Sequence, residues 1–511
     1  MLILIFLILY FILAIRRLDW SVMLFLFALP AYQVRFSLAG IPMTLLEAMI
    51  LISFGVWFFK NWKIILEKIK DKITTRHSAL GFRHFSRYPF DTEIILLLII
   101  AFISIASAGF TDAAFGVFKA YFFEPVLVYI LIFNVLLSKY STFCFEKIVW
   151  PFALSAFCVS VYAILQKIGI FYSPENFWPR VTGPFFYPNA VGLYLGPLIA
   201  LFIGWFLMKI TNYKLQITNK YPISDIRYLK SIFILIGIAS SLIAVFFAQS
   251  EGALIGLAAA TVVMAMFWLM HEYKFGLFLS KALVGFIFLF VIASPFIYLK
   301  LIPEHKYFNF KNRVLNYIAD KAMLKDFSGE VRKQQWRETW KMLSSNPKYF
   351  IFGAGLSGYK DAVKPFHQPG IFFNAERDPD FRRKLILFDD NYKAAHWRPV
   401  EIYMYPHNFV LNIWVELGLA GVMVFLWILY KIFNFQFSIF PPKADQPWAG
   451  NLQFPISKFR FIHFGLFGAF IVITIHGLVD VPYFKNDLSV MFFVLLALIG
   501  IDELQNKKKP D

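Results

Sequence analysis

The stretch 233-FILIGIASSLIAVFF-247 is apolar on every side and contains no charged residue. Strands of a membrane barrel alternate apolar and polar side chains, whereas an unbroken apolar run is typical of a helix that crosses a bilayer. Comparable runs lie at about 2–15, 20–34, 43–59, 94–110, 120–137, 147–170, 188–208, 231–248, 252–270, 282–300, 408–430, 461–480 and 487–501. The sequence therefore predicts an all-α polytopic membrane protein with 12 or 13 transmembrane helices.

Composition supports this fold class. Of the 511 residues, 59% are hydrophobic and only 16% are charged, against about 25% charged residues in soluble proteins. These values exclude a water-soluble enzyme, a disordered chain, collagen and a coiled coil. Cys144 and Cys158 are too few for a disulfide framework or a four-cysteine zinc site. The first apolar run ends at Arg16-Arg17 like a signal peptide, but no small-residue cleavage site follows, so we expect a retained helix.

The positive charge is concentrated in a few connections. Lys and Arg crowd the 60–93 and 209–230 connections, which the positive-inside rule places in the cytoplasm. Counting spans then places 431–460 and the Lys507-Lys508-Lys509 tail inside, and 171–187, 301–407 and 481–486 outside. Topology explains most of the net charge of +18, so nucleic-acid binding is not expected. The predicted division is 1–300 for ten helices, 301–407 for an extracytoplasmic cap, and 408–511 for the last helices and a basic cytoplasmic tail.

The 301–407 segment is polar and much longer than an ordinary connection. Aromatic clusters within it favour a folded, partly helical cap, with a helix over 328–345 that opens at Ser328 and closes at Asn346-Pro347. An ordered loop with packing roles alone is the other interpretation.

Two predicted outer-face patches carry arginines. In 178-WPRVTGPFFYPNAVG-192, prolines and glycines hold Arg180 near the surface, where it could bind lipid phosphate or serve as an interfacial anchor. In 328-SGEVRKQQWRETWKMLSSNP-347, Arg332, Trp336 and Trp340 share a helix face and Arg337 lies one step round. That face could bind a diphosphate or a sugar, or lie on the membrane surface as an amphipathic helix.

Further candidate functional groups follow these two arginine patches in the sequence. The loop 353-GAGLSGY-359 could let backbone approach a ligand, but it lacks the lysine of a phosphate-binding loop. His407 and Asn408 stand at a membrane boundary, where a neutral imidazole can accept a proton, although a lone histidine is more often structural. Polar groups within spans are functional candidates by default; they are Asn412, Glu416, His476 and Asp480. The cap histidines lack metal-ligand spacing, so no catalytic metal is expected; they are His305, His367 and His396.

In their order, these patches resemble the bacterial O-antigen ligase and O-antigen polymerase family of integral membrane glycosyltransferases. The most specific part is 407-HNFVLNIWVELGLAG-421. The other matching stretches are Arg180-Val181 with Gly183 and Pro188-Asn189, Ser250 with Gly252, Arg332-x-x-x-Trp336, Asn346-Pro347, and Gly353-x-Gly355. The resemblance covers roughly residues 150–500.

The resemblance implies a GT-C-like, all-helical transferase in the bacterial cytoplasmic membrane that needs no cofactor. Its donor would be a glycan on undecaprenyl diphosphate, transferred at the extracytoplasmic face to a glycan, lipid or protein acceptor; ligase and polymerase remain open. By matching position, His407 would be the general base, and Arg180 and Arg332 would hold the diphosphate. Where the family often has Ser-Arg-Gly, this chain has Ser250-Glu251-Gly252, so that arginine is absent or replaced, for example by Arg337. The remaining candidate substrate contacts are Trp336, Asn408, His476 and Asp480.

The chemistry of the residues agrees with such a transferase. A diphosphate leaving group needs cations where charge develops, the acceptor hydroxyl needs only a base, and attack opposite the leaving group would invert the anomeric carbon. A lipid-linked glycan transporter or flippase is the alternative, because intramembrane Glu416 and Asp480 would suit it. Transporters commonly show paired halves, which this sequence lacks by inspection. A scaffold for a cell-envelope complex is a third possibility.

Overall fold

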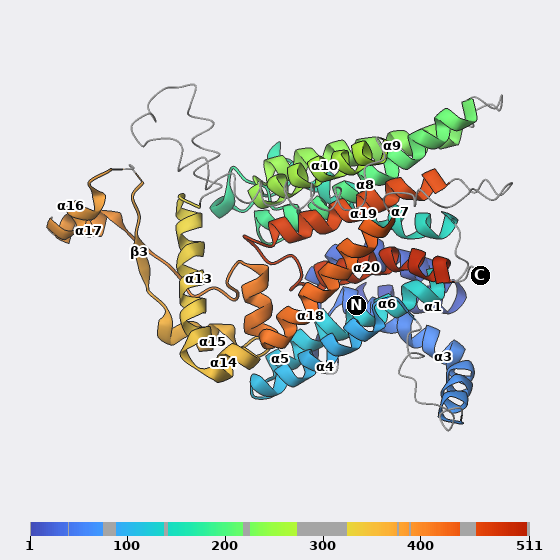
Figure 1. Cartoon of the computed structure of the whole chain (residues 1–511), viewed down its shortest axis with the longest axis horizontal. Helices are drawn as coiled ribbons and strands as arrows, with labels where there is room; N and C mark the ends of the chain where they lie inside the picture. The colour runs from blue at the N-terminus through green and yellow to red at the C-terminus, as the bar shows by residue number, and fades with distance from the viewer. Residues whose placement is uncertain are drawn as a thin grey trace.

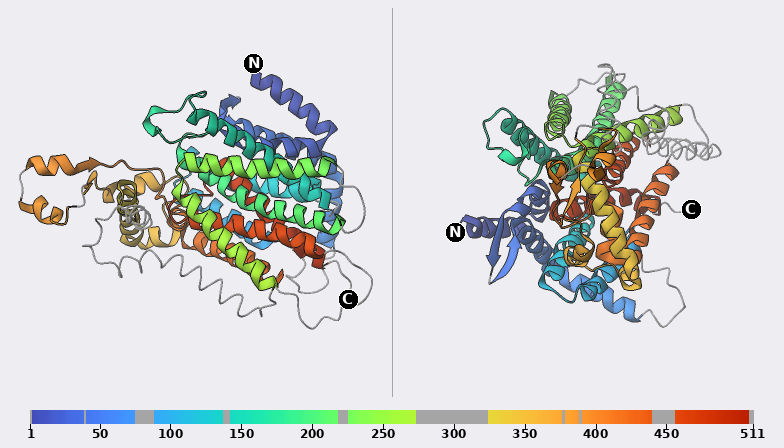
Figure 2. Two further views of the ribbon diagram at one scale, coloured as in Figure 1. Left: turned by 90° about the horizontal axis from the view of Figure 1, so that it is seen from above. Right: turned by 90° about the vertical axis from the view of Figure 1, so that its left-hand side faces the viewer.

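The computed structural model describes residues 2–38, 40–74, 88–136, 142–217, 225–272, 324–375, 378–387, 390–439 and 456–507. A bundle of apolar helices forms its body, and a layer of shorter helices and two-stranded sheets lies across one end (Figures 1 and 2). The predicted all-α polytopic membrane fold is confirmed.

The first part of the bundle runs to residue 136. Its helices are α1 (Leu2–Arg16), α2 (Leu18–Phe27), α3 (Leu45–Thr74), α4 (Asp91–Ser107), α5 (Asp112–Phe118) and α6 (Glu124–Leu131). The 3-10 helix η1 (Leu29–Gln33) precedes an antiparallel hairpin of β1 (Arg35–Leu38) and β2 (Ile41–Thr44), in which Arg35 pairs with Thr44. Two π-helical turns, η4 (Lys119–Phe123) and η5 (Ile132–Leu136), flank α6.

Six longer helices complete the bundle. They are α7 (Thr142–Lys167), α8 (Pro188–Ile217), α9 (Asp225–Phe247), α10 (Glu251–Glu272), α19 (Ile456–His476) and α20 (Asn486–Lys507). The helix α18 (Phe409–Ile439) joins the bundle from the cap, and the 3-10 turn η6 (Glu175–Phe177) lies between α7 and α8.

A helix occupies each predicted apolar run that falls within the described residues, and the run at 282–300 lies outside them. Six described helical segments are long and apolar enough to cross a membrane alone, and five shorter apolar helices accompany them. Ion pairs also join segments predicted to lie at the cytoplasmic end. Lys431 pairs with Glu93 at 2.8 Å, and Lys209 pairs with Glu146.

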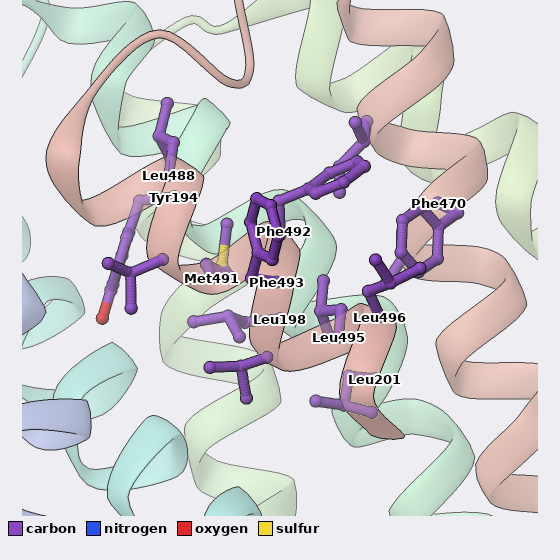
Figure 3. Packing of buried hydrophobic residues seen from close by; sticks show 14 of the residues in the cluster. Tyr194, Leu198, Leu201, Phe470, Leu488, Met491, Phe492, Phe493, Leu495 and Leu496 are labelled. Carbon is purple, nitrogen blue, oxygen red and sulfur yellow. The ribbon is translucent and has the colours of Figure 1, made fainter. Parts of the chain in front are cut away.

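The core between α8, α19 and α20 is built from large apolar side chains (Figure 3). Leu198 and Phe492 are at most 1% exposed. The ring of Phe492 lies 5.5 Å from that of Phe470 and 5.4 Å from that of Tyr483. Tyr483 belongs to the turn between α19 and α20, so this packing fixes the turn as well as the helices.

The cap contains the helix predicted over 328–345, here α13 (Phe327–Ser345), which lies across the end of the bundle (Figure 1). Its N-cap is Asp326, whose carboxylate accepts from Gly329 N at 3.2 Å. The predicted start at Ser328 was therefore wrong, because an aspartate two residues earlier caps the helix. Asn346 ends α13 as predicted and also caps α14 (Pro347–Phe352), with Lys348 N donating to its side chain at 2.8 Å.

The rest of the cap consists of short elements. They are α15 (Tyr359–Val363), η9 (Lys364–Phe366), β3 (Gly370–Phe372), α16 (Phe381–Leu387), α17 (Asp390–His396) and β4 (Trp397–Pro399). β3 and β4 pair antiparallel, with Ile371 opposite Arg398. Together with α16 and α17 they form an arm that projects away from the bundle (Figures 1 and 2).

The glycine-rich loop after α14 packs its backbone against a break in α18. Gly418 interrupts α18 with φ +72°, which leaves carbonyl groups of the preceding turn without helical partners. The carbonyl of Val415 instead accepts from Ala354 N at 2.7 Å and from Gly355 N at 3.2 Å. The predicted close backbone approach in 353–359 thus occurs, but toward another backbone rather than a ligand.

Glu416 completes this junction. Its carboxylate accepts from Ser357 N at 2.7 Å, and its backbone carbonyl accepts from the hydroxyl of Ser104 in α4. The first contact joins α18 to the cap loop, and the second joins α18 to α4. Glu416 therefore has a structural task in this fold, and a transport role is not needed to explain a carboxylate at that position.

The junction makes Gly353 a sensitive position. A Cβ there would lie 2.3 Å from the carbonyl oxygen of Val415, and Gly353 has φ +71°. With φ +71° and ψ −167°, this backbone conformation is essentially restricted to glycine and costs other residues on the order of 1–3 kcal/mol, and a backbone carbonyl cannot rotate away. We expect Gly353→Ala to lower the thermal unfolding midpoint of the detergent-solubilised protein. Gly237→Ala is the control, because a Cβ at Gly237 meets nothing within 4 Å. Equal midpoints for the two variants would contradict this account.

Candidate active site

The turn 406–409 is held between α13 and the turn that joins α19 to α20. On one side, Trp336 Nε1 donates to the carbonyl of Pro406 at 2.9 Å. On the other side, Phe409 N donates to the carbonyl of Gly477 at 2.7 Å, and Asn408 Nδ2 donates to that of Leu478 at 3.0 Å. Three segments far apart in sequence thereby meet at His407.

Trp336 and Asn408 were predicted as substrate contacts, and their polar groups instead bind backbone. Asn408 also caps α18, because its Oδ1 accepts from Leu411 N at 3.0 Å. These contacts position the turn that carries His407. A substrate contact of either residue stays a prediction.

His407 itself is oriented by a neighbour on α13. Its Nδ1 lies 3.0 Å from Oε1 of Gln335, so a proton on Nδ1 leaves the lone pair on Nε2. The described part of the chain offers Nε2 no hydrogen-bond partner. His407 also has φ +45°, a strained backbone conformation of the kind that clusters at functional sites. This half-buried imidazole therefore has the arrangement of a general base.

Asp480 and His476 approach the same point from the end of α19. Asp480 is 1% exposed and His476 is 2% exposed. Asp480 accepts from Val481 N at 2.8 Å and from Asn189 Nδ2 at 3.1 Å. The Nδ1 of His476 is buried and has no hydrogen-bond partner among the described residues.

The Ser250-Glu251-Gly252 segment leaves room for the imidazole of His476. A Cβ on Gly252 would lie 2.4 Å from Cδ2 of His476, and one on Gly192 would lie 2.1 Å from Oγ of Ser250. The small residues of this segment therefore allow α8, α10 and α19 to pack closely around the site. Nothing in these contacts requires an arginine at position 251.

Arg332 and Arg337 differ in their surroundings on α13. Arg332 is half-buried, its Nε is buried without a partner in the described part of the chain, and its charge acts on His407, His476 and Asp480. Arg337 is exposed and makes no hydrogen bond or ion pair with any described residue. The geometry favours Arg332 as the cation of this site over Arg337.

Arg180 joins the site through a chain of hydrogen bonds. Its Nη2 donates to Asn189 Oδ1 at 2.7 Å, and Asn189 in turn donates to Asp480. Its Nε donates to the carbonyl of Ala248 at 2.9 Å. Arg180 thus braces the connection between α9 and α10 and places its guanidinium beside Asn189, which links it to Asp480.

The charges around His407 set its protonation. Burial and the Arg332 cation lower the pKa of His407, while Asp480 opposes that shift. For Asp480, burial favours the neutral carboxyl, yet the positive charge of His407, His476 and Arg332 brings its pKa below the usual value. At neutral pH the site therefore holds a neutral imidazole beside an ionised carboxylate.

The other predicted histidines lie apart from this site or cannot be placed. His367 belongs to a polar cluster inside the cap, where Nδ1 lies 3.2 Å from Glu338 Oε2 and Nε2 lies 3.0 Å from the carbonyl of Val400. His396 contacts Tyr392 and Phe381 in the projecting arm. His305 falls outside the described residues. Within those residues, no group of three or more His, Cys, Asp or Glu could hold a metal ion.

Several residues of the site were not singled out from sequence. Gln335 and Asn189 orient His407 and Asp480, and Lys485 lies near Asp480 on the short turn before α20. Gln335 could not be recognised from the sequence, because its partner His407 lies 72 residues away. Lys485 could have been noticed as a charged residue between two apolar runs at the predicted outer face.

Residues 236–426 match the family model described as O-Antigen ligase. Over this region the chain is similar to the O-antigen ligase family. The match includes Arg332, Gln335 and His407, whereas Arg180, His476 and Asp480 lie outside it and join the site by folding. A search of curated proteins found no match. The resemblance inferred from the sequence motifs is thus confirmed, and with it an O-antigen ligase-like membrane protein.

The charges around His407 predict its titration. Arg332→Gln removes a cation that lowers the pKa of His407, so we expect that pKa to rise; Asp480→Asn removes an opposing anion, so we expect it to fall. Lys341→Gln, an exposed cation on the same helix, should leave it unchanged. The measurement is a ¹³C-histidine NMR titration in detergent, with the signal assigned by its loss in His407→Gln. A shift with Lys341→Gln but none with Arg332→Gln would refute the assigned geometry.

Proposed function

We propose that this O-antigen ligase-like protein transfers a glycan from undecaprenyl diphosphate to an acceptor hydroxyl, with inversion and without a metal ion. The reaction takes place at the outer face of the bacterial cytoplasmic membrane. The observation that carries the proposal is the arrangement of His407: Gln335 orients the imidazole, its Nε2 is open, and Arg332 places a cation beside it. A base next to a cation suits attack of a hydroxyl on a diphosphate-linked sugar.

In the proposed mechanism, Nε2 of His407 takes the proton of the acceptor hydroxyl as its oxygen attacks the anomeric carbon. The bond from that carbon to the diphosphate oxygen breaks, and undecaprenyl diphosphate leaves with the bonding electrons. Arg332 and Arg180 stabilise the negative charge that develops on the leaving group, as guanidinium groups bind phosphate oxygens in a fork geometry. Asp480 stabilises the imidazolium that forms, since its charge favours the protonated form of His407.

The location of the site also fits a lipid-linked donor. His407 stands directly before α18, and Asp480 lies between α19 and α20, so the reacting groups lie where helices end. Exposed apolar side chains lie close in sequence to Arg180 and to its partner Ala248; they are Trp178, Phe186 and Phe246. A carrier with its isoprenoid tail in the bilayer could present its diphosphate at this level without leaving the membrane.

The first test is glycan transfer in proteoliposomes from undecaprenyl-diphosphate-linked oligosaccharide to candidate acceptors in the presence of EDTA. We expect His407→Ala to slow release of undecaprenyl diphosphate by about 10²–10⁴-fold, the usual contribution of a general base. Arg332→Gln should slow it by about 10²-fold or more, the effect of losing one charge-stabilising group. The exposed Lys341→Gln is the matched control.

Two outcomes of the same assay would reject this mechanism. Full activity of His407→Ala would show that His407 is not the base. Loss of wild-type transfer in the presence of EDTA would show that the reaction needs a metal ion. Movement of the donor between leaflets, with no release of undecaprenyl diphosphate for any acceptor, would instead establish the flippase alternative. Folding of each variant is checked by its elution profile in detergent.

The stereochemistry gives an independent prediction. A single displacement opposite the leaving group inverts the anomeric carbon, whereas a covalent glycosyl-enzyme intermediate would lead to retention. The anomeric proton couplings of donor and product, measured by NMR, should therefore correspond to opposite configurations. A retained configuration would mean that a side chain acts as nucleophile, which His407 as a base does not provide.

A further inference from the structure

A second polar cluster lies beside His407, on the side of Tyr405. The rings of Tyr405 and His407 are 4.8 Å apart, and the Tyr405 hydroxyl donates to that of Tyr187 at 3.3 Å. The ammonium of Lys485 lies 3.9 Å from the ring centroid of Tyr187. The contacts lead without interruption from the proposed base to a lysine, and the mechanism above gives that lysine no task.

Lys485 is the unusual member of this cluster. It is half-buried, yet it has no ion pair or hydrogen-bond acceptor for its ammonium among the described residues, and the Tyr187 ring is its contact. An ammonium carries three donors, and removing it from water without acceptors costs free energy. A cation–π contact offsets part of that cost. The remaining donors are therefore available to a bound molecule.

Neighbouring groups also lack partners. Asn486 is 9% exposed and Asp487 is 1% exposed. The Nδ2 of Asn486 and the Oδ1 of Asp487 are both buried with no hydrogen-bond partner in the described part of the chain. Unsatisfied buried polar groups are rare in folded proteins. A donor and an acceptor left open next to Lys485 indicate that hydrogen bonds are completed here by a ligand or by water.

The charge balance distinguishes between possible ligands. Burial lowers the pKa of Lys485, and the carboxylates of Asp487 and Asp480 oppose that shift, so two anions lie within electrostatic reach of one cation. Two carboxylates against one ammonium leave no net positive charge at Lys485 to attract a phosphate. A hydroxyl group accepts from an ammonium or amide and donates to a carboxylate. The cluster therefore suits a polyhydroxylated ring better than an anion.

Arg332 belongs to a different part of the site. Arg332 lies on α13, whereas Lys485 lies on the turn before α20. Among the described residues, no hydrogen bond, ion pair or ring contact joins Arg332 to Tyr187, Tyr405 or Lys485. We therefore assign the diphosphate to Arg332 and a different ligand group to the surroundings of Lys485. A base must contact the hydroxyl from which it takes a proton, so the acceptor sugar must lie against His407.

We propose that Lys485, seated on the ring of Tyr187, binds the hydroxyl groups of the acceptor sugar on the Tyr405 side of His407. This inference rests on the proposed transferase and adds the chemical class that this part of the site recognises. Lys485 is assigned to acceptor binding, and Arg332 to the diphosphate of the donor. The two assignments make opposite predictions for two small probes.

The test measures binding of the intact protein in detergent, without turnover. The sugar probes are methyl glycosides of glucose, galactose and N-acetylglucosamine, observed by saturation-transfer NMR. Inorganic pyrophosphate is the anion probe, observed by ³¹P line broadening. The variants are Lys485→Met, Lys485→Arg and Arg332→Gln, with the exposed Lys360→Met as matched control.

We expect Lys485→Met to abolish saturation transfer to the glycoside that binds the wild-type protein and to leave pyrophosphate broadening intact. Lys485→Arg should restore part of the glycoside signal, and Arg332→Gln should show the reverse pattern. Loss of pyrophosphate binding in Lys485→Met, with the glycoside signal retained, would make Lys485 a phosphate ligand and overturn the inference. Absence of any glycoside signal in the wild-type protein would overturn it as well.

Kinetics separate this inference from the proposed function. If proteoliposomes carry out transfer, Lys485→Met should raise KM for the acceptor at least about tenfold, a factor corresponding to about 1.4 kcal/mol, while KM for the donor stays unchanged. A rise in donor KM alone would contradict the assignment. If the protein carries out no transfer but still binds sugar through Lys485, the inferred sugar site stands and the proposed transferase activity is rejected.

Discussion

The hydrogen bond from Phe409 N to the carbonyl of Gly477, at 2.7 Å, is the contact on which the geometry of the site depends. It ties the residue after Asn408 to the end of α19, while Trp336 ties the residue before His407 to α13. The histidine between these fixed points has a left-handed backbone that its own conformational preference would not select. Tertiary contacts impose that conformation, and the same contacts set the direction of the imidazole.

This arrangement requires α18 to begin at the cap and then to enter the bundle. Gly418 provides the break, and the loop after α14 supplies the amide groups that the broken helix lacks. The cap is therefore part of the site's framework, because its loop satisfies the helix that follows His407. The carboxylate of Glu416 belongs to the same solution, since it accepts from Ser357 N in that loop. A substitution in this junction would therefore alter the position of His407 without contacting it.

The fold was largely readable from sequence because a lipid environment permits few spanning structures. Apolar runs such as 233–247 had to be helices, and Asn346-Pro347 marked the end of α13 as expected. Local patterns failed where the partner of a residue is distant in the chain. The glycines of 353–359 were predicted to form a ligand loop, although Gly353 is required by the close approach of Val415 and Gly355 by that of α4. Ser328 was predicted to cap α13, although Asp326 performs that task.

For the site, sequence supplied the chemical groups but not their ranking. Arg332 and Arg337 lie on one helix and share its composition, and only folding separates a half-buried cation from an exposed one. Gln335 had no distinguishing feature, because a glutamine acquires a role only from the atom it contacts. The family match includes His407 and Arg332 but not Asp480, so the electrostatic partner of the proposed base lies outside the matched region and joins it only through the packing of α19 against α8 and α10.

A transferase of this kind must hold a charged leaving group and an uncharged acceptor on either side of one base. If cations surrounded His407 completely, its pKa would fall further and the imidazolium formed during transfer would be destabilised. If carboxylates surrounded it, a diphosphate would be repelled. Asp480 resolves this conflict, since its charge opposes the effect of Arg332 on His407 and also acts on the ammonium of Lys485. In the proposed mechanism, a carboxylate that acts on both cations thus allows one histidine to serve both substrates.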